Sequence, residues 1–283
     1  MKRILNGFIA VVLGLSLVAC GSNESTTNGE VAATESEGGV LRVGMECNYA
    51  PFNWTTTEAT DTSVQINSVD YADGFDVVIA SMLAERMGME VEIVKLDWDS
   101  LIPALQNNQI DAVIAGMTDT EERRQSVSFT TPYYVSEEVV IVRSDSEFAN
   151  ITSIQELSGS NVVGQMNTIY DDIINQIDGV NHMPAAETFP AAIQALQGGA
   201  VDAVTSELPV AIGVTSANPD LKYIQFAEGQ GFSGSEQDAS VSIAVAKDNT
   251  ELLNALQEAL DSISEDERQQ LMLDATNRQP AGE

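Results

Sequence analysis

Arg123 has the chemistry to bind a small organic anion. A guanidinium group donates two parallel, charge-assisted hydrogen bonds to a carboxylate. Thr120 has the spacing of a helix N-cap, which would put Arg123 in the first turn of a helix, where backbone amides also favour an anion. An ion pair with Glu121 or Glu122 at the surface is the simpler role. Spacing alone supports the two roles equally.

Alternating strands and helices are expected to position this arginine. Apolar runs predict strands over 40–45, 91–96, 111–115, 139–142, 162–164, 202–205 and 241–246. Helical periodicity predicts helices over 76–87, 100–106, 168–176, 189–196, 208–214, 251–263 and 265–275. This pattern indicates an α/β fold with two lobes, each a mostly parallel sheet flanked by helices, joined by two hinge segments. We assign 40–142 plus 241–283 to the first lobe and 143–240 to the second.

The segments that follow the carboxyl ends of parallel strands are the expected place for a binding site. These segments are 46–54, 97–99, 116–124, 165–168 and 206–207. They should converge on the gap between the lobes, and domain interfaces are a preferred place for small-molecule sites. Arg123 lies in the third of them.

The composition excludes several classes of protein. The chain has 12 Lys plus Arg against 43 Asp plus Glu, and the net charge of −31 argues against a nucleic-acid-binding protein. One His and two Cys argue against a metal centre or a disulfide framework, and we expect no metal and no cofactor. Cys47 has no basic neighbour in the sequence and only His182 as a possible partner. We therefore interpret it as a small apolar core residue and not as a nucleophile.

The N-terminus has the pattern of a secretory signal. Lys2 and Arg3 precede an apolar run over 8–18, shorter than the roughly 20 residues that span a membrane. The end of the run, Leu-Val-Ala-Cys at 17–20, resembles the lipobox of bacterial lipoproteins, which implies cleavage after residue 19 and lipid on Cys20. A soluble secreted protein with a free Cys is the alternative. The polar stretch from 22 to 39 predicts a flexible spacer.

A longer series of motifs resembles the extracytoplasmic solute-binding proteins, family 3, of amino-acid ABC importers. The matching segments occur in the family's order at 41–46, 49–52, 98–103, 108–118, 121–123 and 127–134. The resemblance covers the chain from Val40 to the last helix. It implies a periplasmic-binding-protein-like fold of type II that closes on a free amino acid and then docks on an ABC permease driven by an ATPase. It also implies a monomer, without enzyme activity, anchored outside the bacterial cell membrane by lipid on Cys20.

The resemblance implies roles for five polar or backbone positions. Arg123 matches the arginine that grips the ligand α-carboxylate, and Gly116 and Thr118 match positions that contact the same ligand. At Gly116 such a contact is restricted to the main chain. Thr168 matches the start of the helix that touches the carboxylate, and Glu207 matches the acid that accepts hydrogen bonds from the α-ammonium group.

Three further positions concern the ligand side chain. Tyr49 and Trp98 match aromatic walls, and each such ring contributes about 0.5–2 kcal/mol to binding an organic cation. Glu46 matches a position that is acidic in lysine, arginine and ornithine binders. A neutral ligand would leave a slot-facing Glu46 unpaired, at a cost of about 1–3 kcal/mol. We therefore expect a cationic amino acid. If Glu46 turns outward or binds an amide, a polar neutral one such as glutamine or cystine is expected.

An enzyme on the same scaffold is the alternative from another class. A cyclohexadienyl dehydratase or a lytic transglycosylase would use Glu207 or Glu46 as a general acid, which requires a pKa raised by an apolar pocket. The segment 53–71 is rich in Thr, Asp, Asn and Ser and predicts a surface insertion of unassigned role.

Overall fold

The computed structural model describes residues 38–234 and 239–280. The predicted signal sequence, Cys20 and the spacer up to residue 37 lie outside the described residues. No helix in the described ranges is long and apolar enough to cross a membrane.

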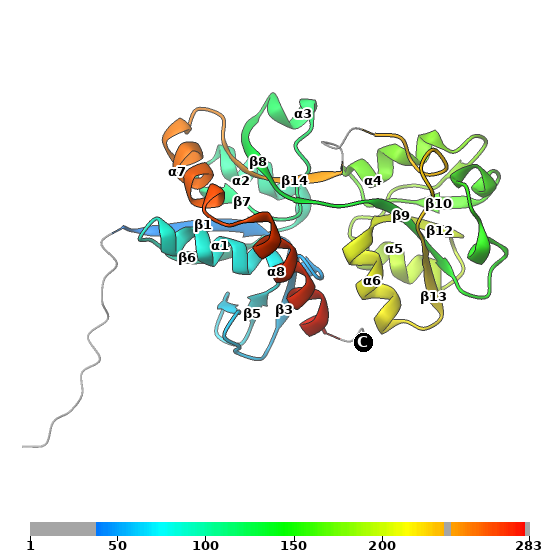
Figure 1. The fold of residues 1–283 in the computed structure, drawn as a ribbon, viewed down its shortest axis with the longest axis horizontal. Helices are drawn as coiled ribbons and strands as arrows, with labels where there is room; N and C mark the ends of the chain where they lie inside the picture. Colours follow the sequence, from blue (N-terminus) through cyan, green and yellow to red (C-terminus); the bar gives the residue numbers. More distant parts are fainter. Residues whose placement is uncertain (1–37, 235–238, 281–283) are drawn as a thin grey trace, which may run out of the picture. The chain divides into compact units, whose positions relative to one another are not determined.

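The first five-stranded sheet has the strand order β6-β1-β7-β14-β8 (Figure 1). Its strands are β1 (Val40–Met45), β6 (Glu90–Lys95), β7 (Ala112–Val113), β8 (Val127–Val135) and β14 (Ser240–Ala246). β1 pairs in parallel with β6 and β7, whereas β14 pairs antiparallel with β7 and β8. The sheet is therefore mixed, because the chain returns to it through an antiparallel strand.

Six helical segments of the described residues accompany this sheet. They are α1 (Phe75–Arg86), the 3-10 turn η1 (Trp98–Ser100), α2 (Leu101–Gln106), α3 (Glu121–Arg124), α7 (Thr250–Asp261) and α8 (Glu265–Arg278). α1 buries Val77, Ile79 and Leu83 completely and packs on β6. α7 and α8, orange and red in Figure 1, both contact α1. Soon after α1 ends, Gly88 adopts a φ of +68°, a left-handed conformation that glycine reaches without steric strain.

The second five-stranded sheet has the order β11-β10-β12-β9-β13 and is also mixed. Its strands are β9 (Glu138–Arg143), β10 (Asn161–Val163), β11 (Asn181–His182), β12 (Ala203–Glu207) and β13 (Leu221–Ile224). Its helical segments are η2 (Glu147–Asn150), η3 (Ile154–Leu157), α4 (Ile169–Asp172), η4 (Ile173–Gln176), α5 (Phe189–Gln197) and α6 (Leu208–Ala217). The chain thus forms the predicted α/β fold with helices flanking each sheet. Both sheets are mixed, because antiparallel pairs lie beside the parallel ones that the sequence led us to expect.

The crossing between the sheets lies earlier in the chain than predicted. β9 pairs with β12 and β13, so the strand at 139–142 belongs to the second sheet although we assigned it to the first lobe. The first crossing is therefore at 136–137, between β8 and β9. The Ser136 amide donates a hydrogen bond to the Ala239 carbonyl, which joins this crossing to the returning one. The other lobe boundaries stay a prediction.

The segment 53–71 forms part of a small sheet and is not a simple loop. Its four antiparallel strands are β2 (Asn48–Tyr49), β3 (Asn53–Thr56), β4 (Val64–Gln65) and β5 (Tyr71–Asp73), in the order β2-β3-β5-β4. β2 carries Tyr49, one of the predicted aromatic walls. The small sheet therefore positions part of the candidate site.

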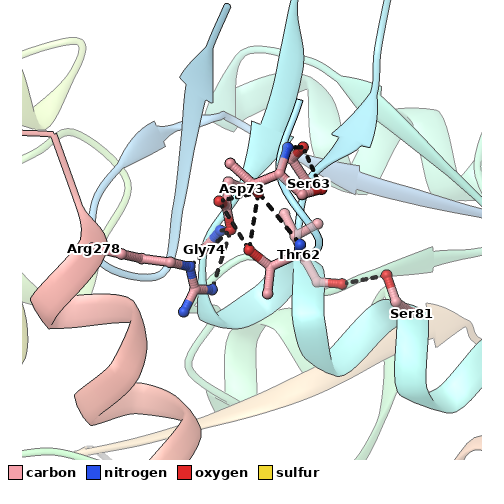
Figure 2. Close-up of polar contacts among 8 residues, drawn as sticks. Thr62, Ser63, Asp73, Gly74, Ser81 and Arg278 are labelled. Carbon is pink, nitrogen blue, oxygen red and sulfur yellow. Dashed lines mark hydrogen bonds and ion pairs between the residues drawn. The ribbon is translucent and has the colours of Figure 1, made fainter. Parts of the chain in front are cut away.

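Asp73 anchors this small sheet to the last helix (Figure 2). Its carboxylate accepts hydrogen bonds from the Thr62 hydroxyl at 3.1 Å and from the Gly74 amide at 2.6 Å. Arg278 of α8 pairs with the same carboxylate at 3.1 Å, and its guanidinium lies 5.8 Å from the centre of the Trp54 ring. The inserted segment is thus tied to α8 by a partly buried ion pair.

Candidate functional site

Seven of the eight predicted ligand-binding residues line one slot. The lining consists of Glu46, Tyr49, Trp98, Ala115, Gly116, Thr118, Arg123, Gln165, Thr168, Ile169 and Tyr170. Most of these positions follow the carboxyl ends of the parallel strands β1, β6, β7 and β10, where the fold was expected to place them. The open space in the slot is about 20 Å³, roughly one water molecule, so an amino acid fits only after the walls move apart.

Arg123 occupies the predicted position in a helical first turn. The Thr120 side chain caps α3 and accepts a hydrogen bond from the Arg123 amide at 3.2 Å. The guanidinium donates to the Thr118 carbonyl at 2.7 Å and to the Asn167 carbonyl at 2.9 Å, and it lies 5.2 Å from the centre of the Trp98 ring. Burial lowers the pKa of Arg123 to about 10, so the group stays charged at neutral pH. Its neighbour Arg124 makes the surface ion pair, with Asp119.

Glu46 is a buried acid in the slot, with only 6% of its surface exposed. The amide nitrogen of Gln165, on the opposite wall, donates to its carboxylate at 3.2 Å. Burial raises the pKa of Glu46 to about 7, and the negative charges of Asp97 and Asp99 act in the same direction, whereas the bond from Gln165 opposes the shift. A cation in the slot would favour the ionised form.

Glu207 is the one predicted ligand-binding residue that does not line the slot. It is 1% exposed and lies behind the slot, where the Tyr49 hydroxyl donates to its Oε1 at 2.6 Å. Burial raises the pKa of Glu207 to about 7, and the hydroxyls of Tyr49, Tyr170 and Ser136 partly offset this shift. Its Oε2 has no hydrogen-bond partner with good geometry. Contact between Glu207 and an α-ammonium group therefore requires the side chain of Tyr49 to move.

A buried network of hydrogen bonds joins Gly116 of the slot lining to Cys47, the neighbour of Glu46. Asp76 accepts hydrogen bonds from the Tyr133 hydroxyl at 2.7 Å and from the Asn53 amide at 2.8 Å. The Tyr133 oxygen in turn accepts from the Gly116 amide, and the Asn53 oxygen accepts from the Cys47 amide. Burial raises the pKa of Asp76 to about 7. Because the Gly116 amide is engaged in the network, its carbonyl is the backbone group left for a ligand.

Cys47 has the environment of a structural residue. Its side chain is buried, and burial raises the pKa of the thiol to about 12, which disfavours the nucleophilic thiolate. His182 lies 2.8 Å from Asp171 instead. No group of three His, Cys, Asp or Glu side chains among residues 38–234 and 239–280 is arranged to hold a metal ion.

Sequence reasoning missed Gln165, Tyr170 and Asn167 as parts of the site. Gln165 and Asn167 lie in the segment 165–168, which was expected to contribute to a binding site because it follows a strand, but Thr168 was the residue assigned a role there. Tyr170 lies two residues beyond Thr168 and still lines the slot. The sequence signal that could have found these residues was their position after a strand, which they share with Thr168.

Comparison with known proteins agrees with this architecture. The family model described as bacterial extracellular solute-binding proteins, family 3, matches residues 41–274. A probable histidine-binding protein of Campylobacter jejuni is 30% identical over 235 residues, covering 82% of this chain and 85% of that protein. The arginine-binding extracellular protein ArtP of Bacillus subtilis is 29% identical over 262 residues, covering 92% of each.

A solved structure shows the same fold. The substrate-binding protein AbpA of an amino-acid ABC transporter from Streptococcus pneumoniae, bound to L-arginine, superposes with a TM-score of 0.70 at 26% identity. The match covers 84% of this chain and 94% of that protein. Two of these relatives are thus named for binding histidine or arginine, and the solved structure is that of a substrate-binding protein of an amino-acid ABC transporter.

Proposed function

The chain belongs to family 3 of the bacterial extracellular solute-binding proteins, and from this we propose that it binds a free cationic amino acid for an ABC importer. Arginine, lysine and ornithine are the ligands that we expect. The observation that carries the proposal is the pair of opposite charges in one slot, the guanidinium of Arg123 and the buried carboxylate of Glu46. An amino acid with a cationic side chain has a complementary group for each.

The proposed binding mode gives each charged group of the ligand a partner of its own. Arg123 has five N–H donors, of which the Thr118 and Asn167 carbonyls engage two, so donors remain for the α-carboxylate. The α-ammonium group donates to the Gly116 carbonyl, and to Glu207 once the tyrosine hydroxyl turns away. The ligand side chain extends between the aromatic walls to Glu46.

Lobe movement admits and releases the ligand in this proposal. The lobes separate at the crossing segments, the amino acid enters, and contacts from both walls shift the population towards the closed form. The closed monomer then docks on a permease whose ATPase drives import. No bond of the ligand is made or broken, so we propose a carrier and not an enzyme.

We further propose that lipid on Cys20 anchors the protein to the outer face of the bacterial cell membrane. The motif at 17–20 supports this part of the proposal. Metabolic labelling with a fatty acid should mark the wild type and not the Cys20→Ala variant, which should be recovered in soluble form. Unlabelled wild-type protein would contradict lipidation without affecting the proposed ligand.

The test of ligand binding is a calorimetric panel of the twenty common amino acids plus ornithine and citrulline. We expect saturable binding of the cationic members, with a melting temperature that rises with ligand concentration and ligand that is recovered unchanged. Preferential binding of glutamine or cystine would replace the cationic assignment. No binding of any member would refute the carrier.

The raised pKa values of Glu46 and Glu207 favour an enzyme as the second candidate. A carboxyl group with a pKa of about 7 can donate a proton at neutral pH, as a general acid must. Incubation with cyclohexadienyl acids or peptidoglycan distinguishes the candidates. Substrate consumed by the wild type and not by the Glu207→Gln or Glu46→Gln variant would establish the enzyme.

A further inference from the structure

We propose that Asn167 is a positioning residue that holds the two walls of the slot together, as a clasp, and slows release of the bound amino acid. The first wall carries Trp98 and Arg123, and the second wall is the segment after β10. The inference about ligand release rests on the proposed carrier function. The clasp itself is a property of the fold and can be measured without a ligand.

Asn167 joins the segment after β10 to three residues of the opposite wall. Its backbone carbonyl accepts hydrogen bonds from the Trp98 indole at 3.1 Å and from the Arg123 guanidinium at 2.9 Å. Its side-chain amide donates to the Asp99 carboxylate at 2.7 Å. Both Trp98 and Arg123 line the slot, so one residue of the second wall fixes two residues of the first.

The backbone at Asn167 is held in an uncommon conformation that makes these contacts possible. Its φ is +59°, in the left-handed region that Asn and Gly adopt more readily than other residues. The turn is fixed on both sides, because the Met166 amide donates to the Ala186 carbonyl and the Thr168 hydroxyl donates to the Gln165 carbonyl. Glycine would preserve the turn and both carbonyl contacts. Only the side chain of Asn adds the bond to Asp99.

The separate contacts of the Asn167 backbone and side chain predict which rate constant the side chain controls. The bond to Asp99 forms only when the walls are together, so it stabilises the closed form and not the open form that admits the ligand. Its loss should therefore accelerate dissociation and leave association nearly unchanged. Asn167 and Asp99 are exposed, and a net hydrogen-bond contribution of the usual size corresponds to about a two- to tenfold change in the dissociation rate.

The test compares Asn167→Gly with a matched control, Asn108→Gly, by stopped-flow measurement of L-arginine binding. Asn108 is also an exposed asparagine with a left-handed backbone, at a φ of +55°, and it does not line the slot. We expect dissociation to be about two- to tenfold faster in Asn167→Gly, with association within about twofold of the wild type, and no change in Asn108→Gly. The reciprocal double variant Asp99→Asn with Asn167→Asp reverses donor and acceptor and should restore slow dissociation.

Two results would overturn the clasp. One is an unchanged dissociation rate in Asn167→Gly. The other is an association rate that falls by as large a factor as the dissociation rate rises, which a general loss of structure would cause. If the wild type binds no amino acid, the carrier proposal fails. The clasp is then tested by small-angle scattering of the ligand-free protein, which measures the population of the open form. A more open population in Asn167→Gly than in the wild type and in Asn108→Gly supports it, and identical populations refute it.

Discussion

Glu46→Gln should weaken the binding of cationic amino acids selectively. The substitution keeps the size of the side chain and its ability to accept a hydrogen bond from Gln165, but it removes the negative charge from the slot. A charge-assisted hydrogen bond contributes about 1.5–3 kcal/mol. Near pH 8 we therefore expect arginine to bind about ten- to a hundredfold more weakly, and glutamine to change only a few-fold.

The pKa of Glu46 makes this difference depend on pH. Because the ligand-free carboxyl has a pKa of about 7 and a cationic ligand favours its ionised form, binding of arginine below pH 7 releases a proton. Through Glu46 alone, the affinity for arginine should then fall about tenfold per pH unit below 7, or about 30-fold by pH 5.5, until the pKa of the bound form is reached. The wild type and Glu46→Gln should then bind arginine with similar affinity at about pH 5.5, where the ligand-free wild type also carries a neutral side chain at this position.

Isothermal titration in buffers of different ionisation enthalpy measures the protons released. Glutamine is the control ligand, since Glu207 also has a pKa of about 7 and contributes to every ligand that carries an α-ammonium group. The extra protons released by arginine relative to glutamine belong to Glu46 and should vanish in Glu46→Gln. Equal losses of affinity for arginine and glutamine, or an arginine affinity independent of pH between 5.5 and 8, would refute the cationic assignment.

Three other predictions follow from the described contacts. Arg123→Ala should weaken every amino acid at least about a hundredfold through loss of the bidentate pair, whereas Arg124→Ala, on the same helix, should leave calorimetric affinities unchanged; equal effects would contradict the assignment. The raised pKa of Asp76, about 7, means that the folded protein binds more protons than the unfolded chain between about pH 4 and 7. Denaturant titrations should show stability falling by about 1–4 kcal/mol as pH rises through that window, and less in Asp76→Asn; an equal slope would contradict this. Arg278→Ala leaves the buried Asp73 carboxylate without its ion-pair partner and should reduce stability by about 1–3 kcal/mol and increase hydrogen exchange within 53–71, with unchanged exchange there as the contrary result.

The long elements of the fold were predictable because their patterns are periodic or continuously apolar. The strand expected over 40–45 is β1 with the same bounds, and the helix expected over 76–87 is α1, from Phe75 to Arg86. Strand direction was not predictable, since buried parallel and antiparallel strands give the same apolar run. The mixed pairing of β14 and β9 is therefore a finding of the structure.

Short elements were beyond the reach of sequence patterns. β2 and β4 contain two residues each, too few to show alternation, so the segment 53–71, which carries β3 and β4 of the small sheet, was expected to be a surface insertion. The strand expected over 111–115 is paired only at Ala112–Val113. In both cases the boundaries are set by the partner strand, which local sequence does not specify.

The convergence of the predicted residues on one slot was predictable, but the depth of each side chain was not. Chain geometry brings the ends of parallel strands together, and this put seven predicted residues in one slot. Glu207 also lies at a strand end, but the hydroxyl of Tyr49, 158 residues earlier, holds it behind the wall. Such a contact depends on tertiary packing and leaves no mark in the local pattern.

The charges around the slot connect ligand choice to pH. Arg123, Glu46 and Glu207 together carry a net charge of −1 when both acids are ionised, and a bound amino acid with a cationic side chain carries +1. A neutral zwitterion would leave one negative charge unbalanced in a buried site, which is unfavourable unless one acid takes up a proton. Both acids have a pKa of about 7, so the cationic ligand should be preferred above pH 7 and the preference should narrow below it. A preference for arginine over glutamine that widened on acidification would contradict this account of the slot.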